Sequence, residues 1–239
     1  MRTAVAIFPG SNCDRDMAVA IKKITGKSPL KLWHKDTEAP NLDLIVIPGG
    51  FSFGDYLRCG ALAARSPIIK NIKNHISRGG ALLGVCNGFQ ILIEANILPG
   101  SLVRNKKLLF TCRETTLEVQ DSIQSPFLSS FNTGDCLNIP VAHNEGNYIA
   151  NNELLKELEN NGRIAFKYKK SSEIETDYNP NGSLNDIAGI LSKNGRVLGM
   201  MPHPERSINS LHGGTDGLKF LTKTIAAACP ASPNPTRPG

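Results

Sequence analysis

The sequence predicts an α/β protein with a flavodoxin-like, doubly wound sheet that is mostly parallel. Three short apolar runs, at residues 3–8, 43–47 and 81–85, each end directly in a turn that contains glycine. Short apolar strands that alternate with helices are typical of a parallel sheet covered on both faces. In such sheets the loops at the carboxyl ends of the strands build the functional site. All three glycine-containing turns fall at those ends.

Two helices of this unit follow from local signals. The first is expected from residue 13 to about residue 24, because apolar residues recur there at helical spacing, and Ser11 or Asn12 is the expected N-cap. The second follows the third apolar run and continues through Glu94. Each helix therefore starts immediately after one of the glycine-containing turns.

Beyond residue 100 the pattern changes to that of an antiparallel extension of the same sheet. Residues 100–150 hold strand-like pieces separated by proline, glycine and asparagine turns. A short helix is expected at 152–160, a hairpin at 187–201 and a last helix at about 217–228. This succession predicts an addition to the parallel unit and no separate fold.

The composition is that of an ordinary globular protein. Of the 239 residues, 40% are hydrophobic and 20% are charged, and a chain of this length can bury a sufficient core without disulfides or metals. We therefore expect one domain over residues 1–228. The proline-rich stretch at 229–239 is expected to be a disordered tail.

The net charge of +6 is spread thinly along the chain. Basic residues occur as pairs and not as runs, and only 6% of residues are aromatic, so a mildly basic surface is favoured over nucleic-acid binding. A basic face for phosphorylated metabolites or for an acidic protein partner stays open. No apolar run reaches the roughly 18 residues that a membrane span requires, so no membrane association is expected.

The six cysteines form neither a C-x-x-C pair nor a cluster with zinc-site spacing. No metal and no cofactor is therefore expected in this chain. The amino-terminal apolar stretch is too short for a signal peptide, and free thiols in a reducing cytoplasm are the default expectation. Most such thiols are inert, so a reactive one must be singled out by its surroundings.

Cys86 is singled out by the glycines around it. In Gly84-Val85-Cys86-Asn87-Gly88 the cysteine lies between a buried strand and a helix, with a glycine two residues away on each side. This is the spacing of a nucleophile elbow, in which a tight backbone turn exposes a reactive side chain at a helix start. Taken alone, the pattern fits a small buried cysteine at a strand end better than a nucleophile.

A second candidate group follows the last predicted strand, in Met201-Pro202-His203-Pro204-Glu205-Arg206. His203 and Glu205 are two residues apart, so in extended backbone both side chains project from one face. A carboxylate beside an imidazole fixes its tautomer and stabilises its protonated form. With an elbow cysteine at another strand end, the pair completes a set of nucleophile, base and orienting carboxylate.

Acyl transfer also needs N–H donors for the oxyanion that forms. The N–H of Asn87 and that of Gly50, in the Pro-Gly-Gly turn after the second apolar run, are the candidates. His143 lies in a compact polar loop, where a structural role and a substrate-lining role are equally compatible with the pattern. The remaining histidines are expected on the surface: His34, His75 and His212.

Four passages resemble the class I, triad-type glutamine amidotransferases, and more closely the glutaminase subunits of phosphoribosylformylglycinamidine synthases. They are FPGSNCD at 8–14, PGGFSFGDYLRCG at 48–60, GVCNGFQ at 84–90 and MPHPER at 201–206. The second passage is long and unusual enough to favour the purine-synthesis subunits over related amidotransferases. The resemblance covers nearly all of residues 1–228.

The resemblance implies a role for each candidate residue. Cys86 would be the acylated nucleophile, His203 the base and Glu205 the group that orients the base. Gly50 and Asn87 would donate their N–H groups to the oxyanion.

The resemblance also implies a glutamine pocket. Gln90 matches the position that contacts the glutamine substrate. His143 to Tyr148 is similar to the family segment A-H-G-E-G-N-Y beside this pocket, with Asn144 where the family usually has glycine. Asparagine tolerates positive φ better than most residues, so the loop is compatible with the substitution.

The resemblance further implies partners. A large synthetase subunit would take the ammonia and convert formylglycinamide ribonucleotide to formylglycinamidine ribonucleotide, and a third small subunit would join the complex. This chain has no G-x-x-x-x-G-K-[ST] loop, so ATP and Mg²⁺ are expected on the synthetase. Three alternatives stay open: a subunit of another amidotransferase, an elbow-cysteine peptidase or chaperone-like protein, and a binding module with a structural Cys86.

Overall fold

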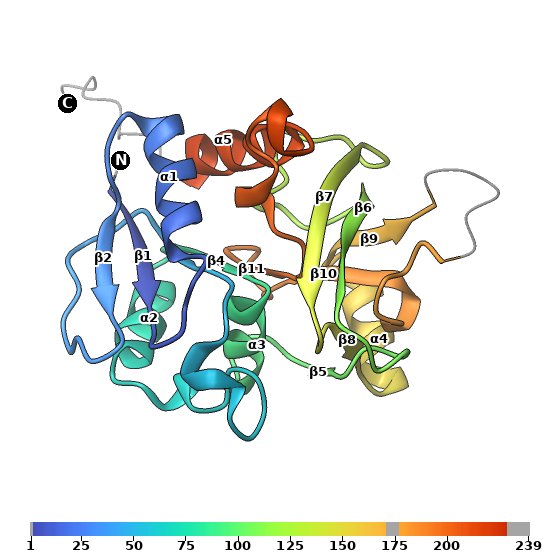
Figure 1. Cartoon of the computed structure of the whole chain (residues 1–239), viewed down its shortest axis with the longest axis horizontal. Helices are drawn as coiled ribbons and strands as arrows, with labels where there is room; N and C mark the ends of the chain where they lie inside the picture. The colour runs from blue at the N-terminus through green and yellow to red at the C-terminus, as the bar shows by residue number, and fades with distance from the viewer. Residues whose placement is uncertain (1, 171–176, 229–239) are drawn as a thin grey trace, which may run out of the picture.

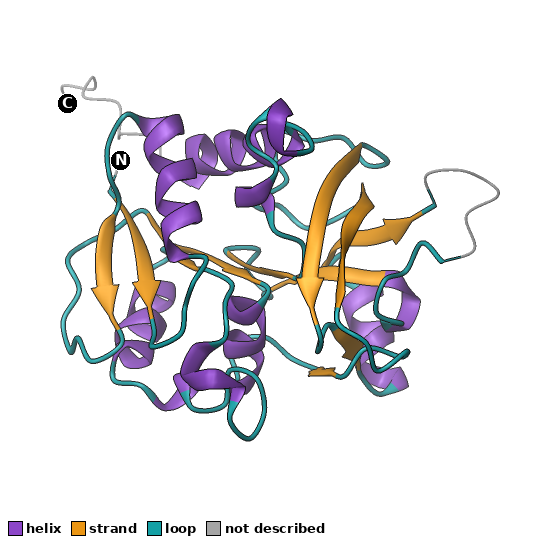
Figure 2. Ribbon diagram, in the orientation of Figure 1, coloured by secondary structure: helices purple, strands orange, loops and turns teal. Residues whose placement is uncertain are grey.

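A nine-stranded mixed sheet with helices on both faces forms the core of the protein (Figures 1 and 2). The computed structural model describes residues 2–170 and 177–228. The tail predicted at 229–239 lies outside these residues. Within the described ranges, no helix is long and apolar enough to cross a membrane.

Five adjacent strands of the sheet run parallel. Two of these strands, at residues 44–47 and 81–85, are buried at every position, as expected when helices cover both faces of a parallel sheet. In spatial order the five are β2 (Leu30–Trp33), β1 (Thr3–Ile7), β3 (Leu44–Ile47), β4 (Ala81–Val85) and β11 (Val197–Met200). The three apolar runs noted in the sequence are therefore strands β1, β3 and β4.

Four antiparallel strands continue the sheet beyond β11. In spatial order they are β10 (Ile187–Leu191), β9 (Ile164–Lys169), β6 (Thr111–Val119) and β7 (Cys136–His143). Strands β6 and β7 alternate between buried and more exposed positions, as is typical of strands with one face on the core. A separate pair joins β5 (Ser101–Val103) to β8 (Asn147–Ile149). The predicted antiparallel extension and the hairpin are confirmed.

The helices divide between the two faces of the parallel half. Figure 1 shows α1 (Asp14–Thr25) and α5 (Asp216–Ala228) on one side, and α2 (Ile68–Ser77) and α3 (Asn87–Glu94) on the other. A fifth helix, α4 (Asn152–Asn160), lies beside the antiparallel strands. The arrangement confirms the predicted doubly wound fold.

Two local details differ from the sequence predictions. The N-cap of α1 is Cys13, with no side-chain hydrogen bond, where Ser11 or Asn12 was expected. The backbone explains the difference, because the N–H of Cys13 donates to the carbonyl of Gly49 (3.3 Å) and the chain turns there. Strand β2 was not predicted, since three of its four residues are exposed and it lies at the edge of the sheet.

The topology brings four chain segments together at one edge. Strands β3, β4 and β11 are parallel neighbours, so the residues that follow them meet at their carboxyl ends. Strand β7 is the far end of the nine-stranded order, yet it returns to this edge, where Pro140 accepts a hydrogen bond from the N–H of His203 (2.8 Å). The antiparallel half thus curves over the carboxyl ends of the parallel half.

Candidate active site

Cys86 occupies a strained turn between β4 and α3. Its φ of 50° and ψ of −105° lie in a region of backbone angles where residues other than glycine are rarely found. The N–H of Cys86 donates to the carbonyl of Met200 (2.8 Å), which ties the turn to β11. Cys86 lies at the amino-terminal end of α3, at the positive end of the helix dipole. This is the geometry of a nucleophile elbow.

The glycines that flank Cys86 allow α3 to approach the sheet. A Cβ atom on Gly88 would lie 2.0 Å from the carbonyl oxygen of Ile47, and one on Gly84 would lie 2.5 Å from Cδ1 of Leu92. The first clash is with backbone, which cannot move aside as a flexible side chain can. Glycine at position 88 is therefore a requirement of the helix–strand packing that forms the elbow.

His203 and Glu205 form a buried pair just after β11. Nδ1 of His203 lies 2.6 Å from Oε1 of Glu205, and both residues are 2% exposed. The carboxylate reaches the ring because Pro204–Arg206 forms a 3₁₀ turn that begins at proline. The prediction of extended backbone through this segment was wrong, whereas the predicted meeting of the two side chains is observed.

The surroundings of His203 favour its protonated form. Burial by itself opposes the charge, but the carboxylate of Glu205 and then the charge of Cys86 outweigh it and raise the pKa of His203 well above its usual value. Among the described residues, Nε2 of His203 and Oε2 of Glu205 have no hydrogen-bond partner. With Nδ1 held by the carboxylate, Nε2 is the nitrogen free to exchange a proton.

A second thiol, which the sequence analysis did not single out, lies beside this pair. Sγ of Cys13 accepts a hydrogen bond from Nη2 of Arg206 (3.1 Å), and ligand atoms of Cys13, His203 and Glu205 lie within 4.8 Å of one another. These are metal-binding residue types, but the guanidinium next to the sulfur repels a cation. We therefore assign no metal. No local signal pairs Cys13 with a residue 193 positions away.

The Pro-Gly-Gly turn after β3 packs against His203 and against Asn12. A Cβ on Gly49 would lie 2.5 Å from Cε1 of His203, and one on Gly50 would lie 2.7 Å from the backbone nitrogen of Asn12. The backbone N–H of Ser52 donates to Oδ1 of Asn87 (3.1 Å), which joins the turn to the start of α3. The turn that holds Gly50 is thus joined to the elbow through Ser52 and Asn87, while Gly50 itself packs against Asn12.

The start of α3 offers a free donor next to the sulfur. Asn87 is the first residue of the helix, and N–H groups in the first turn have no acceptor within the helix. Its side-chain amide donates to Oε1 of Gln90 (2.9 Å), and Gln90 is 6% exposed. Asn87, one of the two predicted oxyanion donors, and Gln90, the predicted substrate contact, are therefore neighbours on one helical turn.

The loop at 142–146, which consists of the last two residues of β7 and the three residues after it, covers this turn from the antiparallel half. Sγ of Cys86 donates to the carbonyl of Ala142 (3.7 Å), and Nε2 of Gln90 donates to the carbonyl of Glu145 (2.6 Å). The side chain of Glu145 lies 3.9 Å from Nε of Arg104. Backbone carbonyls carry both contacts, so the residue types in the loop gave no indication of them.

His143 lies in this loop, and its ring contacts two asparagine side chains. Its Nδ1 is 3.1 Å from Oδ1 of Asn105, and its Nε2 is 3.4 Å from Nδ2 of Asn181. Burial, and then the charge of His203, lowers the pKa of His143 to about 3, so the ring is neutral near pH 7. Of the two roles considered for His143, the contacts favour the structural one.

Two further histidines were expected on the surface and are buried instead. His34 is 7% exposed and its Nδ1 lies 3.4 Å from Oγ of Ser66, and His75 is 4% exposed with Nε2 2.9 Å from the carbonyl of Ala81. The partner of His34 is 32 positions away along the chain and that of His75 is six positions away, and the second is a backbone carbonyl, which no residue type reveals. The side chain of His212 lies outside the described part.

Cys59 is another thiol near the elbow, and its surroundings keep it neutral. Burial, followed by the charge of Asp55, raises the pKa of Cys59 far above its usual value, so this thiol stays protonated. Burial also raises the pKa of Asp55 itself, whose Oδ1 lies 3.5 Å from Nδ2 of Asn87. Of these two neighbouring thiols, only Cys86 combines a helix start with an adjacent imidazole.

Comparisons with known proteins agree with this geometry. Residues 1–215 match the family described as CobB/CobQ-like glutamine amidotransferase domain. Phosphoribosylformylglycinamidine synthase subunit PurQ of Rhizobium meliloti is 54% identical over 225 residues, which are 94% of this chain and 98% of the relative. The subunit of the same name from Bartonella henselae is 49% identical over 228 residues, 95% of this chain and 99% of the relative.

A solved structure shows the same relationship in three dimensions. A chain in the structure of PurLQS from Thermotoga maritima superposes with a TM-score of 0.82 at 39% identity, over 94% of this chain and 97% of that chain. The matches extend over the elbow, the Pro-Gly-Gly turn and the His-Pro-Glu segment. The chain therefore belongs to the CobB/CobQ-like glutamine amidotransferases, within the family of PurQ subunits of phosphoribosylformylglycinamidine synthase.

Proposed function

We propose that this chain is the glutaminase subunit of a phosphoribosylformylglycinamidine synthase and that it releases ammonia from glutamine through a cysteine thioester. The observation that carries the proposal is the meeting of an elbow cysteine, Cys86, with the buried pair of His203 and Glu205. Membership in the PurQ family supports glutamine as the substrate.

In the first half of the reaction the thiolate of Cys86 attacks the carboxamide carbon of glutamine. A C–S bond forms, and the carbonyl oxygen becomes an oxyanion next to the N–H groups of Gly50 and Asn87. Protonated His203 gives its Nε2 proton to the nitrogen, the C–N bond breaks and ammonia leaves. The carboxylate of Glu205 holds the ring through Nδ1 during this transfer.

In the second half water replaces the thiol. The now neutral Nε2 of His203 takes a proton from water, the hydroxide attacks the γ-glutamyl thioester, and the C–S bond breaks to release glutamate. The same two N–H groups hold the second oxyanion. Gln90 lies on the substrate side of the elbow, where its amide is already oriented by Asn87 and by the carbonyl of Glu145.

The ammonia is used by another chain. We propose that a large synthetase subunit, which binds ATP and Mg²⁺, takes it for the conversion of formylglycinamide ribonucleotide to formylglycinamidine ribonucleotide, and that a third small subunit completes the complex. The names of the relatives and the PurLQS title support this assignment. We place the complex in the cytoplasm, in keeping with the free cysteines among the described residues.

Ammonia release from glutamine by the complex with the synthetase subunit tests the proposal. Cys86→Ala should abolish glutamine-dependent amination while amination from free ammonium continues. Cys136→Ala is the matched control, because that thiol is free and exposed. Equal rates of ammonia release by the wild type and Cys86→Ala would reject the proposal, as would a failure of a glutamine-mimicking alkylator to label Cys86.

A further inference from the structure

Asn105 is a buried asparagine that uses its whole side chain to hold the loop at 142–146. It is 1% exposed, and its amide nitrogen donates to the carbonyls of His143 (2.9 Å) and Leu109 (2.9 Å). Its amide oxygen accepts from the N–H of Gly146 (3.0 Å) and lies 3.1 Å from Nδ1 of His143. Its backbone N–H donates to the carbonyl of Asn144 (2.8 Å).

These contacts fix the tautomer of His143. Because the oxygen of Asn105 also faces the N–H of Gly146, it is the acceptor, and Nδ1 of His143 must donate to it. Nε2 of the ring then accepts from Asn181, whose own oxygen accepts from Ser183. The low pKa of the ring is consistent with a neutral imidazole that bridges two asparagines.

The loop that Asn105 holds touches the proposed catalytic centre at two atoms. The carbonyl of Ala142 accepts from Sγ of Cys86, and the carbonyl of Glu145 accepts from the amide of Gln90. Asn105 bonds to the residues between these two carbonyls and not to the nucleophile. Any change in its amide therefore reaches the centre only through the loop.

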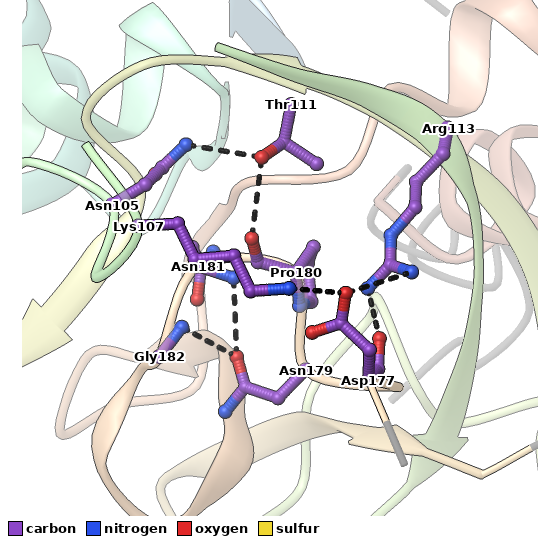
Figure 3. A network of polar contacts seen from close by, with 9 residues as sticks. All are labelled: Asn105, Lys107, Thr111, Arg113, Asp177, Asn179, Pro180, Asn181 and Gly182. Carbon is purple, nitrogen blue, oxygen red and sulfur yellow. Dashed lines mark hydrogen bonds and ion pairs between the residues drawn. The ribbon is translucent and has the colours of Figure 1, made fainter. Parts of the chain in front are cut away.

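Contacts with residues 177–183 also hold the segment around Asn105 in place. Figure 3 shows the amide of Asn105 directed at Thr111, and Thr111 in turn donates to the carbonyl of Pro180 (3.3 Å). In the same view Lys107 and Arg113 both reach Asp177. This outer group connects residues 105–113 with residues 177–183. It is continuous with the loop at 142–146, because Thr111 pairs with His143 in the sheet and Oγ of Ser183 donates to the carbonyl of Gly146 (3.2 Å).

We propose that Asn105 is a positioning residue of the glutaminase, which sets the loop at 142–146 so that the carbonyls of Ala142 and Glu145 orient Cys86 and Gln90. The inference rests on the proposed function. Three pairings of the loop depend on one amide, and no other described side chain bonds to both His143 and Gly146. Losing it leaves these groups unpaired in a buried site, so the loop must move or take in water.

The proposal is tested on the complex with the synthetase subunit by comparing Asn105→Ala with Lys107→Ala. Asn105→Ala should lower kcat/KM for glutamine by about tenfold to about a hundredfold, since small misplacement of reacting groups has effects of this size. It should also slow alkylation of Cys86 by a glutamine-mimicking electrophile much more than alkylation by iodoacetamide. Lys107→Ala, an exposed member of the outer group, should match the wild type.

A second pair of variants separates positioning from general stability. His143→Asn keeps an amide near the position of Nδ1 and should retain more activity than His143→Ala. Thermal unfolding of each variant shows whether the fold is intact, and amination from free ammonium shows whether the synthetase still works. Unchanged kcat/KM in a folded Asn105→Ala would overturn the inference, as would equal slowing of both alkylations or equal activity of the two His143 variants.

These outcomes are distinguishable from failure of the proposed function. If the wild-type complex releases no ammonia from glutamine, the glutaminase assignment itself fails. If the wild type is active and labelled at Cys86 while Asn105→Ala behaves identically, only the inference about Asn105 fails.

Discussion

The two halves of the sheet contribute to the site in different ways. The parallel half supplies the reactive side chains, each directly after a buried strand: Cys86 after β4 and His203 after β11. The antiparallel half supplies backbone carbonyls, from Ala142 near the end of β7 and from Glu145 just after that strand. Reactive groups thus lie where strand ends converge, whereas the part that orients them comes from strands added at one edge.

The difference shows what each half must preserve. In the parallel half specific atoms are needed, because a thiolate, an imidazole and a carboxylate take part in bond making or proton transfer. In the antiparallel half a shape is needed, and it is held by an asparagine–histidine–asparagine chain. Changes in the first half should therefore remove chemistry, and changes in the second should misplace it.

The largest effect is expected for His203→Gln, which removes the base but keeps a polar side chain. Turnover of glutamine by the complex should fall on the order of 10⁶-fold, as when the histidine of a catalytic triad is lost. Amination from free ammonium should be unaffected, because this reaction does not use the glutaminase site. Stopped-flow or coupled assays of both reactions check the split, and a loss of both would contradict the assignment of chemistry to the parallel half.

The pH dependence of the unfolding free energy tests the antiparallel half, because His143 belongs to it. Because the pKa of His143 is about 3 in the folded chain and near 6.5 when unfolded, its stabilising contribution is fully present above about pH 6.5 and is lost as the pH falls toward 3. The loss is at most about 5 kcal/mol over that interval. Urea unfolding between about pH 7.5 and about pH 4.5 measures the upper part of this loss, which is at most about 2.7 kcal/mol.

A matched variant is needed for this measurement, because other histidines titrate in the same range. Burial lowers the pKa of His34 and of His75, whereas the pKa of His203 is raised. Subtracting the pH profile of His143→Asn from that of the wild type leaves the contribution of His143. Parallel profiles for the two proteins would show that the ring is not held neutral by the fold.

The next effect on glutamine turnover is expected for Glu205→Gln. This variant separates the role of the carboxylate from that of the imidazole within the parallel half. The variant keeps the shape of the side chain but removes the charge that raises the pKa of His203 against the opposing effect of burial. Glutamine turnover should fall on the order of 10⁴-fold, and the imidazole should lose its proton at lower pH than in the wild type. NMR titration of isotope-labelled histidine checks the direction, and an unchanged or raised pKa would contradict the role of Glu205.

The smallest effects compare one glycine from each half. Gly88→Ala places a Cβ 2.0 Å from backbone at Ile47, whereas Gly146→Ala places one 2.4 Å from the ring of His143. The first should cost about 3 kcal/mol of unfolding free energy and the second about 1–2 kcal/mol, because a ring can shift and a strand cannot. Gly146→Ala should nevertheless impair glutamine turnover. Equal destabilisation by both variants would remove the distinction between a rigid half and an adjustable half.

Local sequence patterns determined most of the fold and the reactive groups. The continuous apolar runs at β3 and β4 follow from burial on both faces, and the glycines beside Cys86 follow from the close approach of α3. His203 and Glu205 are two residues apart, so a single turn joins them. In each case the interacting groups are neighbours in the chain or repeat with the period of one element, which is why the pattern is visible.

Tertiary structure alone decided what surrounds these groups. Cys13 meets Arg206 across 193 positions, Cys86 meets the carbonyl of Ala142 across 56, and Asn105 meets His143 across 38. Two of these contacts involve backbone carbonyls, which every residue carries, so no residue type marks them in advance. They arise because β7 returns to the carboxyl ends of the parallel strands, and that return depends on the whole sheet rather than on any one segment.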